Sequence, residues 1–174
     1  MASLFNAWRK ALEEYQPRGI RGAFWYRAVV PSRRRTILNM DGALIYGGRF
    51  NAPGEYGALY LSRTEKGCVT EITRRPAHPS KYVVGKIKVT LGKVCDLTDP
   101  ELLKKLKISK KQLTADEWTE TQALGELLRE DGYEGMIVTS AAGDFNNLVI
   151  FTDRLEGASR VELEEVKPLP LPKP

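Results

Sequence analysis

The sequence contains only two cysteines, Cys68 and Cys95, and a single histidine, His78, in 174 residues. Two cysteines cannot build a disulfide framework, and one histidine without a CxxC pair leaves no zinc site. No apolar run approaches the roughly 18 residues that a membrane span needs. No long apolar stretch follows the basic residues near the N-terminus, so we expect no signal peptide. These absences predict a cytoplasmic protein with neither a membrane segment nor a bound metal.

The usual signatures of nucleotide-binding and hydrolytic sites are also missing. The sequence has no GxxxxGKS/T loop, no GxGxxG after a strand and no GxSxG nucleophile elbow. The glycine-rich segment GGRFNAPG has neither of the two nucleotide-binding spacings. His78 lies between prolines in PAHPS, which is typical of a surface turn, so it is a poor candidate for a catalytic base.

Positive charge is concentrated at the start of the chain. The formal net charge is +5, and residues 1–40 alone hold eight basic and two acidic side chains. This excess indicates an anionic partner, which could be a phosphorylated small molecule, a nucleic acid or an acidic protein. The alternative is a solvated basic surface without a partner.

Hydrophobic patterning predicts one α+β domain. Hydrophobic residues make up 42% and charged residues 28% of the chain, as in a globular protein. We expect helices over 3–15, 63–75 and 100–108, and a further helix that Thr114 begins and that buries Trp118. We expect strands over 23–30, 57–61, 82–91, 135–139 and 148–151, and an edge strand near 161–163. Residues 31–56 are expected to be mostly loop.

The domain should cover residues 1–167, and the proline-rich tail 168–174 should be an extended, unpacked end. The sequence shows no internal repeat and no linker, which favours a single unit.

Two arginines are candidates for anion binding. Arg27 lies inside the hydrophobic strand FWYRAVV, where a guanidinium needs a partner because an unpaired buried charge is very costly. It could form a structural ion pair or bind an anion at a cleft. Arg49 follows two glycines in GGRFN, and its planar fork suits phosphate recognition. The alternative for Arg49 is a solvated loop position.

Three further polar residues lie on predicted core elements. Glu71 lies in the middle of the helix CVTEITRR, where it could also form a surface pair with Arg75. Tyr60 alternates with leucines in ALYLS and could be an ordinary packed tyrosine. Ser140 follows the strand GMIVT, where a chain leaves a sheet and ligands often bind, or where a serine simply makes a turn.

The order of these motifs resembles that of the RES-domain family. The resemblance is carried by FWYRAV, GGRFNAPG, ALYLS, the helix with Glu71, WTETQALGELLREDGYEGMIVTSA and NNLVIF, from about residue 24 to 152. It implies a fold similar to that of ADP-ribosyltransferases, with a mixed, split β-sheet, flanking helices and an NAD+ cleft. It also implies a toxin that degrades NAD+, by phosphorolysis in some members, and that pairs with an Xre-like antitoxin.

The resemblance assigns roles to six residues: Glu71, Arg27 and Ser140 in catalysis, and Arg49, Tyr60 and Asn147 in binding NAD+. One position departs from the pattern, since Phe50 stands where many members have tryptophan. NAD+ is expected as substrate, with inorganic phosphate as a co-substrate and with no metal or resident cofactor.

The chemistry of the residue types agrees with that assignment. Breaking the nicotinamide–ribose bond creates an oxocarbenium-like cation, which a nearby carboxylate such as Glu71 stabilises. The arginines can bind the pyrophosphate in bidentate fashion. Nicotinamide departs as a neutral molecule, so the site needs no acid for the leaving group.

The sequence leaves other activities open. Hydrolysis, phosphorolysis and mono-ADP-ribosyl transfer to a protein or nucleic acid would use the same cleft with a different acceptor. A nucleic-acid-binding module without turnover would use Arg33–Arg35 and the N-terminal helix. It ranks below the enzyme, because the sequence has no RNP, zinc-finger or recognition-helix pattern.

Overall fold

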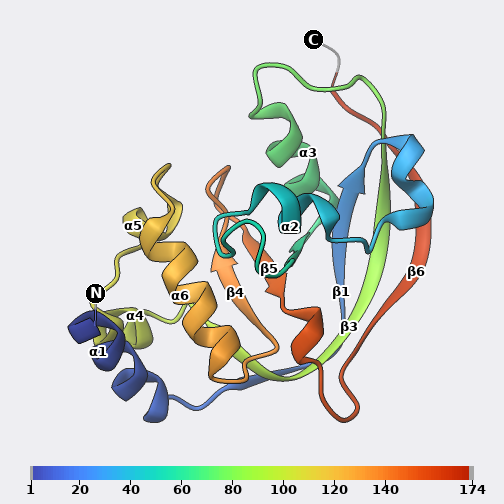
Figure 1. Cartoon of the computed structure of the whole chain (residues 1–174). Coiled ribbons are helices and arrows are strands. Elements are labelled where there is room, and N and C mark those ends of the chain that lie inside the picture. Colours follow the sequence, from blue (N-terminus) through green and yellow to red (C-terminus); the bar gives the residue numbers. More distant parts are fainter. Residues whose placement is uncertain (1, 173–174) are drawn as a thin grey trace.

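The computed structural model describes residues 2–172, which form a mixed α/β domain with helices packed around a sheet (Figure 1). The α-helices are α1 (Ala2–Glu13), α2 (Asp41–Tyr46), α3 (Glu65–Thr73), α4 (Pro100–Leu106), α5 (Lys110–Thr114) and α6 (Thr119–Glu130). The strands are β1 (Arg18–Val29), β2 (Leu59–Ser62), β3 (Tyr82–Asp96), β4 (Gly135–Thr139), β5 (Asn146–Ile150) and β6 (Arg160–Leu169). Two short 3-10 helices are η1 (Pro31–Thr36) and η2 (Thr152–Arg154).

The sheet closes on itself, whereas the sequence led us to expect a split sheet. Its strand order is β1-β2-β5-β4-β3-β6, and a further pairing of β1 with β3 joins the first five strands into a ring. The 15-residue strand β3 makes this possible. Tyr82–Thr90 pairs with β6, while Val94–Asp96 pairs with β4 on the same edge. Register shifts near Ile20 bend β1 along its partner, as β-bulges do.

Side chains alternate between the two faces of each strand, so the buried residues of the sheet form two large hydrophobic cores, one inside the ring and one outside it. The ring interior is filled by residues such as Trp25, Leu61, Ile87 and Leu148. The outer face of β4 and β5 packs against α1 and α4–α6 through residues such as Leu124. In Figure 1 these four helices gather on one side of the strands, and α3 lies above the sheet. Since successive side chains point to opposite faces, Tyr60 lies on the outer face while its neighbours Leu59 and Leu61 fill the ring.

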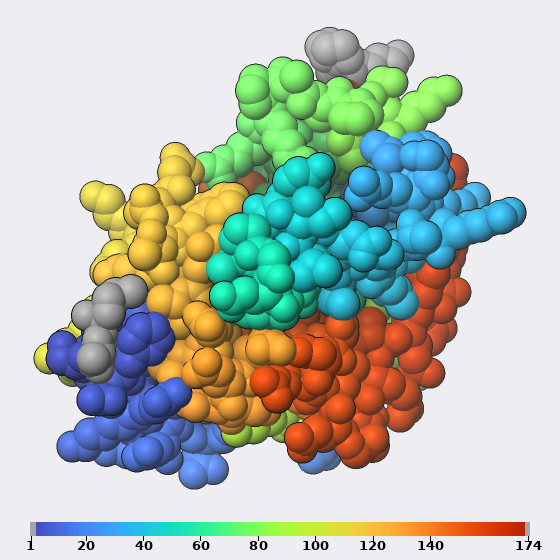
Figure 2. Space-filling model, viewed as in Figure 1, coloured from blue at the N-terminus to red at the C-terminus, as the bar shows by residue number. Residues whose placement is uncertain are grey.

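Several element boundaries differ from the sequence-based expectation. The segment 31–56, which we expected to be mostly loop, also holds two short helices, η1 and α2. In Figure 2 the teal segment around α2 forms a raised block at the centre of the visible face. Helix α3 begins at Glu65, and Thr64 caps it by accepting a hydrogen bond from the Gly67 amide.

The region around Thr114 was predicted wrongly. Thr114 ends α5 instead of beginning a helix, and the capping box is formed by Ser109 and Gln112. Helix α6 starts at Thr119, preceded by Trp118, which is 39% exposed and not part of the buried stripe.

The chain after residue 167 is partly packed. Pro168 and Leu169 pair with Val83 and Tyr82, and Leu169 is buried in a small cluster with Ile72 of α3. The expectation of an unpacked tail from Pro168 onward is therefore wrong for these two residues, and residues 173–174 lie outside the described part of the chain. Within residues 2–172 no helix combines the length and the apolar character needed to cross a bilayer.

Candidate functional site

Glu71 on α3 is held by two polar side chains, that of Ser140 after β4 and that of Asn147 on β5. The Ser140 hydroxyl donates to Glu71 Oε1 at 2.5 Å, and Asn147 Nδ2 donates to the same oxygen at 2.9 Å. Three residues that the sequence predicted as a site are thus in direct contact. Within residues 2–172 no side chain donates a hydrogen bond to the second carboxylate oxygen, Oε2.

The fold explains why Ser140 and Asn147 meet Glu71. Ser140 is the first residue after β4, and its amide bonds to the Phe145 carbonyl at 2.8 Å to close the β4–β5 connection. The Ser140 hydroxyl also accepts a hydrogen bond from the Ala142 amide at 2.9 Å, which fixes its direction. Asn147 lies opposite Val138 and Ser62 in the sheet, on the outer face below α3.

The glycine-rich loop presents Arg49 at the tip of a tight turn. Gly48 and Asn51 form an isolated β-bridge around Arg49 and Phe50, and Phe50 is buried in the outer core. A Cβ at Gly48 would lie 2.4 Å from the Tyr60 hydroxyl, so only glycine permits this close approach. The turn therefore anchors Phe50 in the core and leaves the Arg49 side chain directed away from it.

Tyr60 and Asn51 hold this turn in place. The Tyr60 hydroxyl accepts a hydrogen bond from the Phe50 amide at 3.0 Å and donates to Asn51 Oδ1 at 2.8 Å. Burial raises the pKa of Tyr60, so the phenol stays protonated. Gln122 on α6 adds a hydrogen bond from Nε2 to the Gly48 carbonyl at 2.9 Å. The hydroxyl of Tyr60 is committed to positioning the Arg49 loop.

The Arg49 guanidinium lies among other charges. It donates to the Ala115 carbonyl and lies 5.5 Å from the centroid of the Trp118 ring. Burial lowers the pKa of Arg49, and the nearby positive charge of Arg74 lowers it further, while Asp116 and Glu71 act in the opposite direction. Arg74 and Glu71 are therefore close enough to Arg49 to interact with it electrostatically.

Arg27 contacts a different part of the chain from the other predicted site residues. It projects from the same face of β1 as Trp25, and it donates to the carbonyls of Ile37 at 2.9 Å and Asn39 at 2.8 Å. Burial, followed by the charge of Arg33, lowers its pKa. Within residues 2–172 no hydrogen bond joins Arg27 to the five other candidates. Both partners are backbone carbonyls, so Arg27 fastens the segment 37–39 to the sheet, and among the described residues it does not form the structural ion pair that the sequence suggested.

Comparisons with known proteins decide the family. The sequence profile of the RES domain matches residues 24–173. The chain belongs to the RES-domain family.

Two curated proteins are similar to this chain in sequence. NAD(+) phosphorylase MbcT of Mycobacterium tuberculosis H37Rv is 29% identical over 118 residues, which are 63% of this chain and 63% of that protein. Probable NAD(+) phosphorylase Rv3189 of the same strain is 29% identical over 131 residues, which are 72% of this chain and 61% of that protein. The matched part thus spans less than two thirds of the length of either relative.

A solved structure shares the fold. The crystal structure of the M. tuberculosis MbcT–MbcA toxin–antitoxin complex contains a chain with a TM-score of 0.80 and 21% identity. The match covers 97% of this chain and 93% of that chain, so the RES domain described here has that fold throughout.

Sequence reasoning missed several residues around the site of this RES domain. The missed residues all contact or flank those described above: Arg74 at the C-terminal cap of α3, Asn51 in the glycine-rich loop, and Trp118 and Gln122 near the start of α6. One signal was available: Arg74 lies three positions after Glu71 on a predicted helix, and residues at that spacing are neighbours on its surface. The other three depend on loop packing that the sequence does not encode locally.

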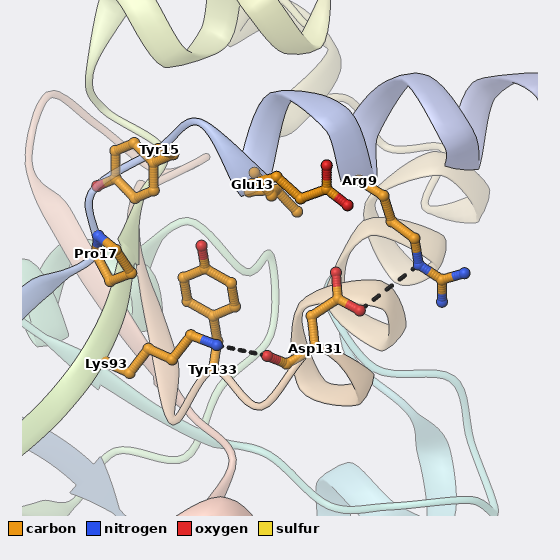
Figure 3. Close-up of a pocket in the computed structure, with 8 residues that line it drawn as sticks. Arg9, Glu13, Tyr15, Pro17, Lys93, Asp131 and Tyr133 are labelled. Atoms are coloured by element: carbon orange, nitrogen blue, oxygen red, sulfur yellow. Dashed lines mark hydrogen bonds and ion pairs between the residues drawn. The ribbon is translucent and has the colours of Figure 1, made fainter.

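A separate surface hollow of about 450 Å³ lies between α1, β3 and the end of α6, and Figure 3 shows its lining. Its cations already have partners: Lys93 Nζ donates to the Asp131 carbonyl at 2.6 Å, and Arg9 pairs with Glu130 and Asp131. None of the six predicted site residues lines it. Within the described part of the chain, no three His, Cys, Asp or Glu residues cluster as metal ligands do.

Proposed function

We propose that this RES domain cleaves the nicotinamide–ribose bond of NAD+, with inorganic phosphate as the acceptor and with no metal or resident cofactor. The observation that carries the proposal is the arrangement of Glu71, whose Oε1 takes hydrogen bonds from Ser140 and Asn147 while Oε2 is left for a substrate. The similarity to two NAD(+) phosphorylases over most of the domain supports the choice of substrate.

The proposed step needs one negative charge at a fixed place. The C–N bond breaks, its electron pair goes to the nicotinamide nitrogen, and nicotinamide leaves as a neutral molecule. Positive charge then develops on the ribose, and the Glu71 carboxylate stabilises it. A phosphate oxygen forms the new bond to the same carbon, and the product is a phosphorylated ADP-ribose. The hydrogen bonds of Ser140 and Asn147 keep the carboxylate in one orientation, so no reorganisation is needed during the step.

The remaining predicted residues receive supporting roles. Arg49 would bind a phosphate of NAD+ through its planar fork, and Tyr60 would hold the Arg49 loop through its bonds to Phe50 and Asn51. Arg27 would act indirectly, through the segment 37–39 that it fastens. In this proposal the closed ring is a variant of the ADP-ribosyltransferase arrangement, with NAD+ bound on the outer face below α3.

The biological side of the proposal is a toxin that acts in the cytoplasm and is neutralised by an Xre-like antitoxin. The solved MbcT–MbcA complex, a toxin–antitoxin pair with this fold, supports it. Expression of the chain alone should lower cellular NAD+ and slow growth, and expression of Glu71→Gln should do neither. Equal NAD+ pools and equal growth in the two strains would contradict the toxin role.

The deciding experiment is incubation of the purified protein with NAD+, with and without inorganic phosphate, followed by mass spectrometry of the products. A phosphorylated ADP-ribose is expected in phosphate, and Glu71→Gln should reduce its formation by about a hundredfold or more, because the amide supplies no charge. The control is Glu65→Gln on the same helix, whose partner is Lys167; it should retain wild-type turnover.

Other products would redirect the assignment. Free ADP-ribose in the presence of phosphate would indicate hydrolysis. A labelled protein or nucleic acid would indicate mono-ADP-ribosyl transfer. No cleavage by the wild type would contradict the proposal.

A further inference from the structure

The segment between α5 and α6 contacts two arginines at once. The Ala115 carbonyl accepts a hydrogen bond from Arg49, and the next residue, Asp116, lies 3.8 Å from Arg74, measured from Oδ1 to Nη2. Arg49 comes from the glycine-rich loop and Arg74 from the end of α3. Two guanidinium groups from distant parts of the sequence therefore converge on two successive residues of a short connection.

Arg74 also forms a hydrogen bond with the β4–β5 connection, which carries Ser140. Its Nη1 donates to the Ala141 carbonyl at 2.6 Å, and Ala141 follows Ser140 directly. The Arg74 guanidinium thus lies one residue from the serine that holds Glu71. An anion bound between Arg49 and Arg74 would be placed beside the carboxylate that faces the reacting ribose.

Asp116 is poorly suited to be a permanent partner of these arginines. Its side chain is 96% exposed, and its contact with Arg74 is long for an ion pair. Exposed ion pairs of this kind contribute little stability, because both charges are already solvated. A phosphate group offers several oxygens to two planar forks and would replace a single carboxylate oxygen with more and shorter charge-assisted bonds.

We infer that Arg49 and Arg74 form a two-armed phosphate subsite and that Asp116 occupies it in competition with the phosphate. This inference rests on the proposed function for the identity of the substrate. The phosphate could belong to the pyrophosphate of NAD+ or be the inorganic co-substrate, since both offer the same chemistry. Burial lowers the pKa of Arg49, and repulsion by the positive charge of Arg74 lowers it further. Both effects agree with a pair of like charges that an anion would stabilise.

The test measures KM for NAD+ at saturating phosphate and KM for phosphate at saturating NAD+. Arg74→Ala should raise one of the two by about tenfold or more, as expected for the loss of a charge-assisted bond, and the affected substrate identifies the source of the phosphate. Asp116→Asn should lower the same KM by about two- to fivefold, because the competing carboxylate is gone. Arg75→Ala, at the exposed neighbouring position, and Asp144→Asn, which removes the partner of Lys110, are the matched controls and should leave both values unchanged.

The double variant makes the test specific. If Asp116 competes for the subsite mainly through Arg74, Asp116→Asn should have a clearly smaller effect on KM in the Arg74→Ala background, where only its charge effect on Arg49 remains. An equal effect in both backgrounds would overturn the inference, as would unchanged KM values for Arg74→Ala. Arg74→Lys, which keeps the charge and a donor for Ala141, should give an intermediate KM. Thermal unfolding of each variant identifies any loss of folding.

The inference and the proposed function fail in different ways. If the wild type does not cleave NAD+, the proposed function is wrong, and the subsite is then tested by calorimetric titration with inorganic phosphate. Weaker phosphate binding by Arg74→Ala than by Arg75→Ala would still support the subsite. Equal phosphate binding by the wild type and Arg74→Ala would overturn it.

Discussion

Ser140 and Glu71 are 69 positions apart in the sequence, and the hydroxyl of one donates to the carboxylate of the other at 2.5 Å. The same hydroxyl accepts a hydrogen bond from the Ala142 amide and donates its one proton in the hydrogen bond to Glu71. The serine thus orients the carboxylate and is itself oriented by its own loop.

Ser140→Ala should therefore lower kcat for NAD+ cleavage by about tenfold or more, since a hydrogen bond to a charged group is lost, while KM changes little. The measurement is steady-state kinetics with NAD+ varied. Asn147→Ala removes the second donor to Oε1 and should act in the same direction. A large rise in KM with an unchanged kcat would instead assign Ser140 to substrate binding.

Arg49→Lys should weaken NAD+ binding although the charge is retained. Lysine is a point charge without a planar fork, and it cannot both reach the Ala115 carbonyl and stack near Trp118 as Arg49 does. Titration with NAD+ of the Glu71→Gln background, which prevents turnover, measures the dissociation constant directly. An unchanged constant would remove Arg49 from the binding site.

Gly125→Ala should destabilise the protein and impair the site, although alanine is usually the better helix former by about 1 kcal/mol. The added Cβ would lie 2.0 Å from the Phe50 carbonyl oxygen, which is backbone and cannot move aside cheaply. The Arg49 turn would be pushed away from α6. The control is Gly42→Ala on α2, where the nearest atom is 3.9 Å away and the same change should be neutral or stabilising.

Unfolding in urea checks the Gly125 prediction. A lower midpoint for Gly125→Ala and an equal or higher one for Gly42→Ala are expected. Equal midpoints for Gly125→Ala and the wild type would show that the loop adapts without cost.

Glu134 should make the stability of the protein depend on pH. Its buried carboxylate accepts hydrogen bonds from the amides of Gly92, Lys93 and Glu156. Burial alone would raise the pKa of Glu134, but the hydrogen bond from Ser159 and those from the three amides outweigh it, and the net pKa is lowered. A lowered folded-state pKa stabilises the fold above the ordinary value of about 4.3, and this contribution is lost as the pH falls through the lower value.

Glu134→Gln should accordingly reduce the free energy of unfolding by about 1–3 kcal/mol at neutral pH, because amide donors lose a charged acceptor. The difference from the wild type should shrink as the pH falls below about 4, where the wild-type carboxylate takes up a proton. Urea unfolding of both proteins across this range is the measurement. A difference that stays constant with pH would show that the charge of Glu134 is not what stabilises the fold.

The sequence predicted much of the secondary structure because alternation and turn residues are local signals. Gly135–Thr139 was predicted with the observed bounds, and the strand after Pro79 was found, although it extends to Asp96. Near Thr114 the prediction took Thr114–Glu117 as the capping box, whereas Ser109–Gln112, which has the same spacing, forms the observed one. In the helix that Ser109 begins, Leu113 packs in the outer core.

The closure of the ring could not be predicted in the same way. It depends on pairing β1 with β3, for example Trp25 with Ile87, and no local pattern encodes a contact over that separation. The same reasoning explains the site. Glu71, Ser140 and Asn147 could be proposed from motifs, but their contact with one another, and the bonding of Arg27 to the segment 37–39 instead, follow from how α3 and the strands pack.

Glu71 is far from Ser140 and Asn147 in the sequence, and this separation affects when the site can form during translation. Glu71 emerges from the ribosome long before Ser140 and Asn147, and β5, which carries Asn147, is inserted between β2 and β4. Until that late strand is in place, Glu71 has neither of the donors that orient it. A nascent chain, or one terminated before β5, therefore lacks the oriented Glu71 carboxylate, and the proposed activity requires translation beyond β5.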